Sequence, residues 1–188
     1  VKEDVKRRLE ESRFSLDTDY MRLAEKQKNG TLTKEDESKL RMMVDDAAKA
    51  AGYAVRVFHA TDSDFTVYDR DKLGANTESQ ATNELWAATA KIGHWFNSKD
   101  LSKQTFSRKA NDSYLKIDNP LRVDNLDDLV SRISYEYGGI EYGTSSGEIA
   151  DVVLRYMAEN DYDGIIVADD EEFGGTSYCV LDSEQIKS

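Results

Sequence analysis

The chain has 188 residues, a net charge of −12, 39% hydrophobic residues and 10% aromatic residues. At this length we expect one domain, or one domain with a helical appendage, whose core needs neither a metal nor a disulfide. The negative charge disfavours general binding to nucleic acid or to anionic membranes, and the lone Cys179 excludes an intramolecular disulfide. No apolar run approaches the length of a membrane span and no signal-peptide pattern opens the chain, so we expect an acidic, soluble, cytoplasmic domain.

The first 52 residues differ in composition from the rest of the chain. They are rich in Glu, Lys, Arg, Ala and Met and contain no strand-like run, so residues 1–52 are predicted to form two or three helices. Thr33 and Asp36 have the spacing of a capping box, and Gly52 suits the end of the helix that follows. We expect this segment to pack on the main domain or to have linked it to a preceding part of a longer protein, since residue 1 is Val rather than Met.

Residues 53–188 alternate between short apolar runs and amphipathic stretches. Strands are predicted over residues 54–58, 94–96, 114–117, 121–123, 164–168 and 177–181, and helices over about 77–92, 126–133 and 145–157. Pro120 precedes one of these strands, and a central strand would not tolerate it. Because strands and helices mix without regular βαβ alternation, the predicted fold class is α+β.

Two motifs that imitate functional sites are explained better by local structure. Residues 143–147 have the G-x-S-x-G pattern, but His59 and His94 both precede Ser145, whereas a hydrolase with this motif has its histidine later in the chain. We therefore interpret Ser145 as a helix cap. Residues 159–164 imitate the start of a calcium loop, but an apolar run follows, which favours a turn entering a buried strand.

Classical metal and nucleotide motifs are also missing from the sequence. Two distant histidines and one cysteine do not form a zinc site, so no metal is expected, and neither a phosphate loop nor a G-x-G-x-x-G turn occurs. One stretch of the acidic chain is nevertheless basic and could receive phosphate groups. In this stretch Asp100 is opposed by five cations, Lys91, Lys99, Lys103, Arg108 and Lys109.

Three further motifs occur in an informative order. The first is R-V-F-H-A-T, which ends a predicted strand with His59 and Thr61; the second is G-H-W-F, which contains Trp95; the third pairs D-G-I-I-V with the run 177–188. Together they resemble the ADP-ribosyltransferase fold in its His–Tyr–Glu branch. They are most similar to the domains of this type in the polyvalent proteins of phages and conjugative elements. The resemblance covers residues 17–188, including a helical lead-in before the His59 strand.

The resemblance implies an NAD cleft between two small, roughly orthogonal sheets, with transfer of ADP-ribose and release of nicotinamide. It implies that His59 hydrogen-bonds the nicotinamide-side ribose, with Thr61 as its neighbour in the motif. Trp95 stands in the place of the tyrosine that stacks on the nicotinamide ring, a role that an indole can keep. The resemblance further implies that Phe96, Ser98 and Gln185 bind NAD. We expect the imidazole of His59 and the indole of Trp95 to face each other across one groove.

The chain departs from the family at the third motif residue, because Ser177 stands where the family has its glutamate. That carboxylate holds a ribose hydroxyl and stabilises the positive charge that develops as the glycosidic bond breaks. Serine accepts a hydrogen bond but carries no charge. We therefore group Ser177 with Glu171 and Glu172 as candidate catalytic residues, the two acids reaching the site if the following Phe-Gly-Gly turn folds inward.

Three functional hypotheses follow from these observations. The first is an NAD-dependent mono-ADP-ribosyltransferase that modifies a macromolecular acceptor, expected to be a protein, within the conflict between a mobile element and its host. The second is a weakened or inactive module that binds NAD or ADP-ribose, and the third is an interaction domain with an acidic surface. Domain boundaries of 1–52 for the helical lead-in and 53–188 for the transferase-like domain are predicted in each case.

Overall fold

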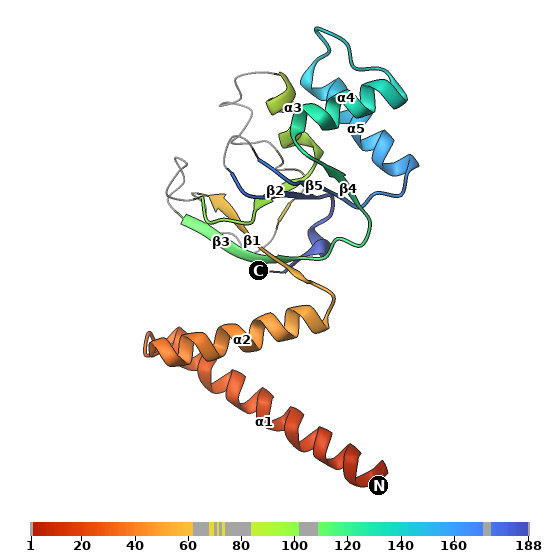
Figure 1. The fold of residues 1–188 in the computed structure, drawn as a ribbon. Helices are drawn as coiled ribbons and strands as arrows, with labels where there is room; N and C mark the ends of the chain where they lie inside the picture. Colours follow the sequence, from red (N-terminus) through yellow and green to blue (C-terminus); the bar gives the residue numbers. More distant parts are fainter. Residues whose placement is uncertain are drawn as a thin grey trace. The chain divides into compact units, whose positions relative to one another are not determined.

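The computed structural model describes residues 2–61, 68–69, 71, 73, 84–101, 109–170 and 174–187. Contacts within the chain divide it into two compact units, residues 1–52 and residues 53–188. Both units are drawn in Figure 1, and each is considered by itself. Within the described residues, every helix is too short or too polar to cross a membrane.

The first unit consists of two helices, α1 (Lys2–Lys28) and α2 (Lys34–Ala50). The Thr33 hydroxyl accepts a hydrogen bond from the Asp36 backbone N–H at 3.1 Å, which confirms the predicted cap. Leu23 and Leu40 are buried where the helices meet. Lys39 forms an ion pair with Asp19 across the helices, but both side chains are substantially exposed, so the apolar contact contributes most to the pairing.

The second unit contains all the strands of the described chain. Its elements are β1 (Val55–Thr61), α3 (Glu84–Ile92), β2 (His94–Asn97), β3 (Lys109–Leu115), β4 (Pro120–Val123), α4 (Leu126–Tyr137), α5 (Ser146–Glu159), β5 (Gly164–Val167), β6 (Ser177–Val180), the 3₁₀ turn η2 (Ser183–Gln185) and β7 (Ile186–Lys187). The predicted α+β class is therefore confirmed.

The strands form one hydrogen-bonded sheet in the order β4-β5-β6-β2-β1-β3-β7. All of β1 pairs with β3, and all of β2 pairs with β6, but β1 and β2 pair at a single position, Phe58 with Asn97. The sheet thus consists of two halves, β4-β5-β6-β2 and β1-β3-β7, that meet at one crossing point. The expected pair of small sheets is present in this form.

Two hydrophobic clusters fill the unit. The larger one lies between α3, α4, α5 and one face of the β4-β5-β6-β2 half, with Met157, Ile165 and Cys179 fully buried (Figure 1). The smaller one joins side chains of both halves and includes Val57 of β1 and Phe96 of β2. The two halves are therefore held together by side chains more than by backbone hydrogen bonds.

Local sequence signals explain how several elements begin. The Ser145 hydroxyl and the Glu148 carboxylate form a reciprocal capping box at the start of α5, which confirms the helix-cap interpretation of the G-x-S-x-G pattern. Pro120 opens β4, which among the described strands pairs with β5 alone and forms an edge of the sheet, a position that suits the missing N–H of proline. The helix predicted over about 77–92 is seen as α3 from Glu84 onward, and its earlier part lies outside the described residues.

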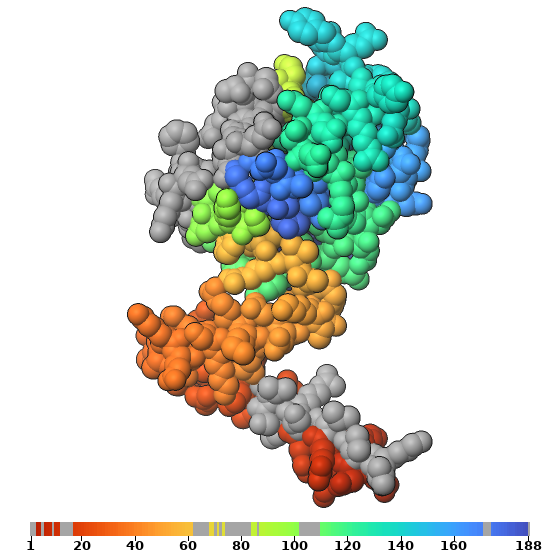
Figure 2. Space-filling model, in the orientation of Figure 1, coloured from red at the N-terminus to blue at the C-terminus, as the bar shows by residue number. Residues whose placement is uncertain are grey.

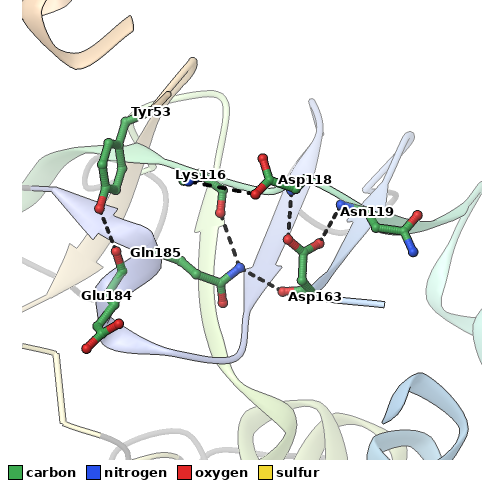
Figure 3. Close-up of polar contacts among 7 residues, drawn as sticks. All are labelled: Tyr53, Lys116, Asp118, Asn119, Asp163, Glu184 and Gln185. Carbon is green, nitrogen blue, oxygen red and sulfur yellow. Dashed lines mark hydrogen bonds and ion pairs between the residues drawn. The ribbon is translucent and has the colours of Figure 1, made fainter. Parts of the chain in front are cut away.

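Hydrogen bonds of the Gln185 side chain, here called the latch, join the C-terminal residues to the sheet near the end of β3 and the start of β5 (Figure 3). The Gln185 amide donates hydrogen bonds to the carbonyl oxygens of Lys116 at 3.2 Å and Asp163 at 2.8 Å. Its Oε1 accepts from the backbone N–H groups of Leu181 and Asp182, both at 3.0 Å. One side chain thus links η2, the end of β3 and the start of β5.

The carboxylate of Asp163 stabilises the neighbouring turn. Its two oxygens accept hydrogen bonds from the backbone N–H groups of Asp118 at 2.7 Å and Asn119 at 2.8 Å, as Figure 3 shows. This carboxylate therefore binds backbone, and β5 begins at the next residue, Gly164. The interpretation of residues 159–164 as a turn entering a buried strand is confirmed.

Substitution of Gln185 by Ala is expected to lower the free energy of unfolding by about 1–3 kcal/mol, because it leaves partly buried backbone groups without their partner. Chemical denaturation measures this loss. The matched control is Glu184→Ala, since the Glu184 side chain is exposed and makes none of the latch contacts. Its carbonyl oxygen accepts from the Tyr53 hydroxyl at 2.7 Å, and this main-chain group is kept in the variant. Equal stability of the two variants would contradict the assignment of Gln185 as the latch.

Candidate functional site

The candidate site lies where the two halves of the sheet meet. Next to the single paired position of β1 and β2, the Nδ1 of His59 lies 2.8 Å from the carbonyl oxygen of Trp95. A carbonyl can only accept, so Nδ1 carries the proton and donates it. A side chain of β1 thus makes a hydrogen bond to β2 beside the point where backbone pairing ends.

Aromatic rings surround the imidazole of His59. Its centroid lies 5.6 Å from that of Tyr68 in a T-shaped arrangement and 5.5 Å from that of Phe96. Tyr68 is itself anchored by a contact of 3.4 Å between its hydroxyl and the buried Ser113 hydroxyl. Burial lowers the pKa of His59 below its ordinary value, partly offset by the hydrogen bond to Trp95. At neutral pH the ring is therefore uncharged, and in this tautomer Nε2 carries the lone pair.

Trp95 points away from His59. Its indole Nε1 donates to the carbonyl oxygen of Thr89 in α3 at 2.7 Å, and the ring packs against the hydrophobic cluster beneath the helices. Side chains alternate along a strand, so Phe96 lies on the opposite face and contacts His59 instead. The indole of Trp95 and the imidazole of His59 therefore lie on opposite faces of the sheet. This corrects the expectation that they face each other across one groove.

The other residues assigned to NAD binding have different surroundings. Thr61 is buried at the end of β1 and shares a strand face with His59. Phe96 is buried in the smaller core cluster, so it positions the imidazole through packing. The Ser98 hydroxyl accepts a hydrogen bond from the Thr176 backbone N–H at 3.0 Å. Gln185 forms the latch at the ends of β5 and β6 that are opposite to Ser177, and the structure does not bring it into the site.

A polar cluster occupies the adjoining ends of β2 and β6. The amide Nδ2 of Asn97 donates to the Ser177 hydroxyl at 3.2 Å, and that hydroxyl in turn donates to the carboxylate of Asp170. Asn97 and Ser177 are 4% and 7% exposed, so these groups are held in a mostly dry environment. The cluster combines an amide, a hydroxyl and a carboxylate within one corner of the sheet.

The loop that follows β5 brings Asp170 to this corner. The Asp170 backbone N–H donates to the Gly175 carbonyl at 2.9 Å, and the Gly174 N–H donates back to the Asp170 carbonyl at 2.6 Å. Gly175 has a φ of +80°, and a Cβ there would lie 2.8 Å from the Ser98 hydroxyl oxygen. The close approach of the loop to β2 therefore requires glycine at this position.

Two members of the polar cluster, Asn97 and Asp170, were not selected from the sequence. Asp170 belongs to the acidic run 169–172, but the sequence alone does not say which of these acids turns toward Ser177. The predicted acids Glu171 and Glu172 lie outside the described residues, as do Lys103 and Arg108 of the basic stretch. The informative signal was the missing acid at position 177, which requires a neighbouring acid if the charge is retained.

A shallow hollow of about 390 Å³ lies elsewhere, beside the turn between α4 and α5. This turn stands out from the surface in Figure 2. The lining includes Glu141, Glu148 and Asp151 against one cation, Arg155, so the hollow repels an anionic dinucleotide. Within the described ranges, no three His, Cys, Asp or Glu side chains are grouped to hold a metal ion.

Stability should depend on pH through His59. Its folded-state pKa lies below the ordinary value of 6.5, so below about pH 6.5 the unfolded chain binds a proton that the folded chain excludes. The free energy of unfolding contributed by this residue is therefore complete above that pH and is lost as the pH falls through it. Between about pH 7.5 and 5.5, the Tm of the wild type should fall more with decreasing pH than the Tm of His59→Gln, in which this titration is absent. Equal changes of Tm with pH in the two proteins would contradict a partly buried, neutral imidazole.

Comparison with known proteins adds one match. A family model described as "ADP-ribosyltransferase in polyvalent proteins" matches residues 49–188, which include β1 to β7 and the whole polar cluster. No curated protein and no solved structure matches the chain.

Proposed function

Because the chain belongs to the family of ADP-ribosyltransferases in polyvalent proteins, we propose that its second unit binds NAD and transfers ADP-ribose to a macromolecular acceptor, expected to be a protein. Nicotinamide is the second product. NAD is a substrate of this reaction, and no resident cofactor or metal enters the proposal.

The observation that carries this proposal is the setting of His59 at the crossing of the two half-sheets. Its Nδ1–H is committed to the Trp95 carbonyl, and burial keeps the ring neutral. A neutral imidazole of this tautomer has an acceptor nitrogen, which is the type of group that binds a ribose hydroxyl. This supports the role that the family assigns to the histidine.

The proposed reaction breaks the bond between the anomeric carbon of the ribose and the nicotinamide nitrogen. The bonding electron pair leaves with the nicotinamide, which neutralises the ring, and positive charge develops on the ribose. A nucleophile of the acceptor then attacks the anomeric carbon and loses its proton to solvent. Groups that fix the ribose and carry negative charge nearby accelerate the first step.

The roles proposed for the aromatic residues follow their observed contacts. Trp95 contributes its main-chain carbonyl, which orients His59, and its indole fastens β2 to α3. Phe96 supports the same imidazole from the core. Thr61 and Ser98 remain proposed NAD contacts, since each lies at a strand end beside the site.

A second function is favoured by Ser177, which has no charge where the family has a carboxylate. If no other acid compensates, the unit binds NAD or ADP-ribose without turnover. Such a module would still be stabilised by its ligand, because a ligand that binds only the folded state raises the free energy of unfolding.

Thermal unfolding with NAD separates these functions from a purely structural role. At an NAD concentration 100 times its Kd, binding should add about 2.7 kcal/mol of stability, and nicotinamide should appear in the solution if turnover occurs. His59→Gln should abolish most of this NAD-dependent shift. Tyr135→Ala is the matched control, since this side chain on α4 is 92% exposed and the variant should respond as the wild type does. A wild type that shows no shift with NAD or ADP-ribose would contradict the proposed function.

A further inference from the structure

The position that lacks the family carboxylate has a carboxylate beside it. Ser177 starts β6, and its hydroxyl donates a hydrogen bond to Oδ2 of Asp170, seven residues earlier in the chain. We propose that Asp170 supplies the negative charge of the site, and that Ser177 acts as the positioning residue that holds it there. This inference rests on the proposed function.

The reach of the two arrangements is similar. In a glutamate, a carboxylate oxygen lies about 3.5 Å beyond Cβ, after two C–C bonds and one C–O bond. In this chain the serine C–O bond followed by one O–H···O hydrogen bond spans about the same distance. A carboxylate held by the Ser177 hydroxyl therefore lies about as far from the Cβ of position 177 as the carboxylate of a glutamate there would.

The hydrogen bonds around Ser177 set the direction of its proton. The Asn97 amide donates to the Ser177 oxygen, which occupies a lone pair and leaves the hydroxyl proton for Asp170. Asn97 is itself fixed by two further bonds, from its Nδ2 to the Gly174 carbonyl at 3.1 Å and from the Lys99 N–H to its Oδ1 at 2.8 Å. The hydrogen-bonded series from the Asn97 amide through the Ser177 hydroxyl to the Asp170 carboxylate is therefore oriented before any ligand binds.

The backbone around Asp170 is equally restrained. Its N–H and its carbonyl are both bonded to the Gly174-Gly175 turn, and Asp169, its neighbour, donates its N–H to the Asp124 carbonyl at 3.0 Å. A charge that is held in place does not need to reorganise when the transition state forms, so its stabilising effect is large. During the reaction the carboxylate stabilises the positive charge on the ribose and forms no covalent bond.

The test compares the two adjacent acids. Asp170→Asn removes the charge while keeping the shape, and it should lower kcat for nicotinamide release from NAD about 100- to 1,000-fold. The NAD-dependent melting shift should persist in this variant. Asp169→Asn is the matched control, since Asp169 is exposed and lies outside the cluster, and it should retain wild-type turnover.

Two further variants test the role of Ser177. Ser177→Ala should lower kcat with little change in KM, because it loosens the charge without removing it. The double variant Asp170→Ser with Ser177→Glu moves the carboxylate to the family position and should recover turnover to within about tenfold of the wild type. Recovery in this exchange would not be expected if Asp170 had only a structural role.

The possible failures can be distinguished. If the wild type releases nicotinamide and Asp170→Asn does so equally well, the inference on Asp170 is wrong and the proposed function stands. If the wild type shows the NAD-dependent shift but no turnover, Asp170 does not supply the catalytic charge and the binding function remains. A wild type without any shift overturns the proposed function, and this inference with it.

Discussion

The hydrogen bond from His59 to the Trp95 carbonyl is the interaction on which the arrangement of the site depends. It spans the place where β1 and β2 stop pairing, so the imidazole replaces backbone hydrogen bonding between the two half-sheets. Tyr68 and Phe96 then pack against the ring, and its partial burial keeps it neutral. The position and the tautomer of this residue follow from the contact, whereas its neutral charge follows from burial, whose effect on the pKa the hydrogen bond partly offsets.

Much of the fold could be predicted from local sequence signals. The capping box at Ser145, the edge strand opened by Pro120 and the amphipathic stripes of α4 and α5 depend on residues a few positions apart. Such features follow from backbone chemistry at each site. The motif order then indicated the family, and the match over residues 49–188 agrees with it.

The parts that sequence reasoning missed depend on contacts between distant segments. Alternation along β2 places Trp95 on one face and Phe96 on the other, but it could not say which of these faces His59 meets, because that depends on how β1 meets β2. Gln185 carried a motif match, yet its amide is bound to backbone near the far ends of two strands. Asp170 became recognisable only when the loop after β5 was seen to turn back toward Ser177.

The single paired position between the half-sheets has a consequence for how the spacing of the two halves is set. Strands joined by a continuous ladder keep a spacing of about 4.8 Å whatever their side chains are. Here the seam is filled by side chains such as Val57 and Phe96, so its width varies with the volume of a few residues. Replacement of one buried ring by a larger or smaller side chain would therefore change the spacing of the two halves while leaving the strand pairing within each half intact.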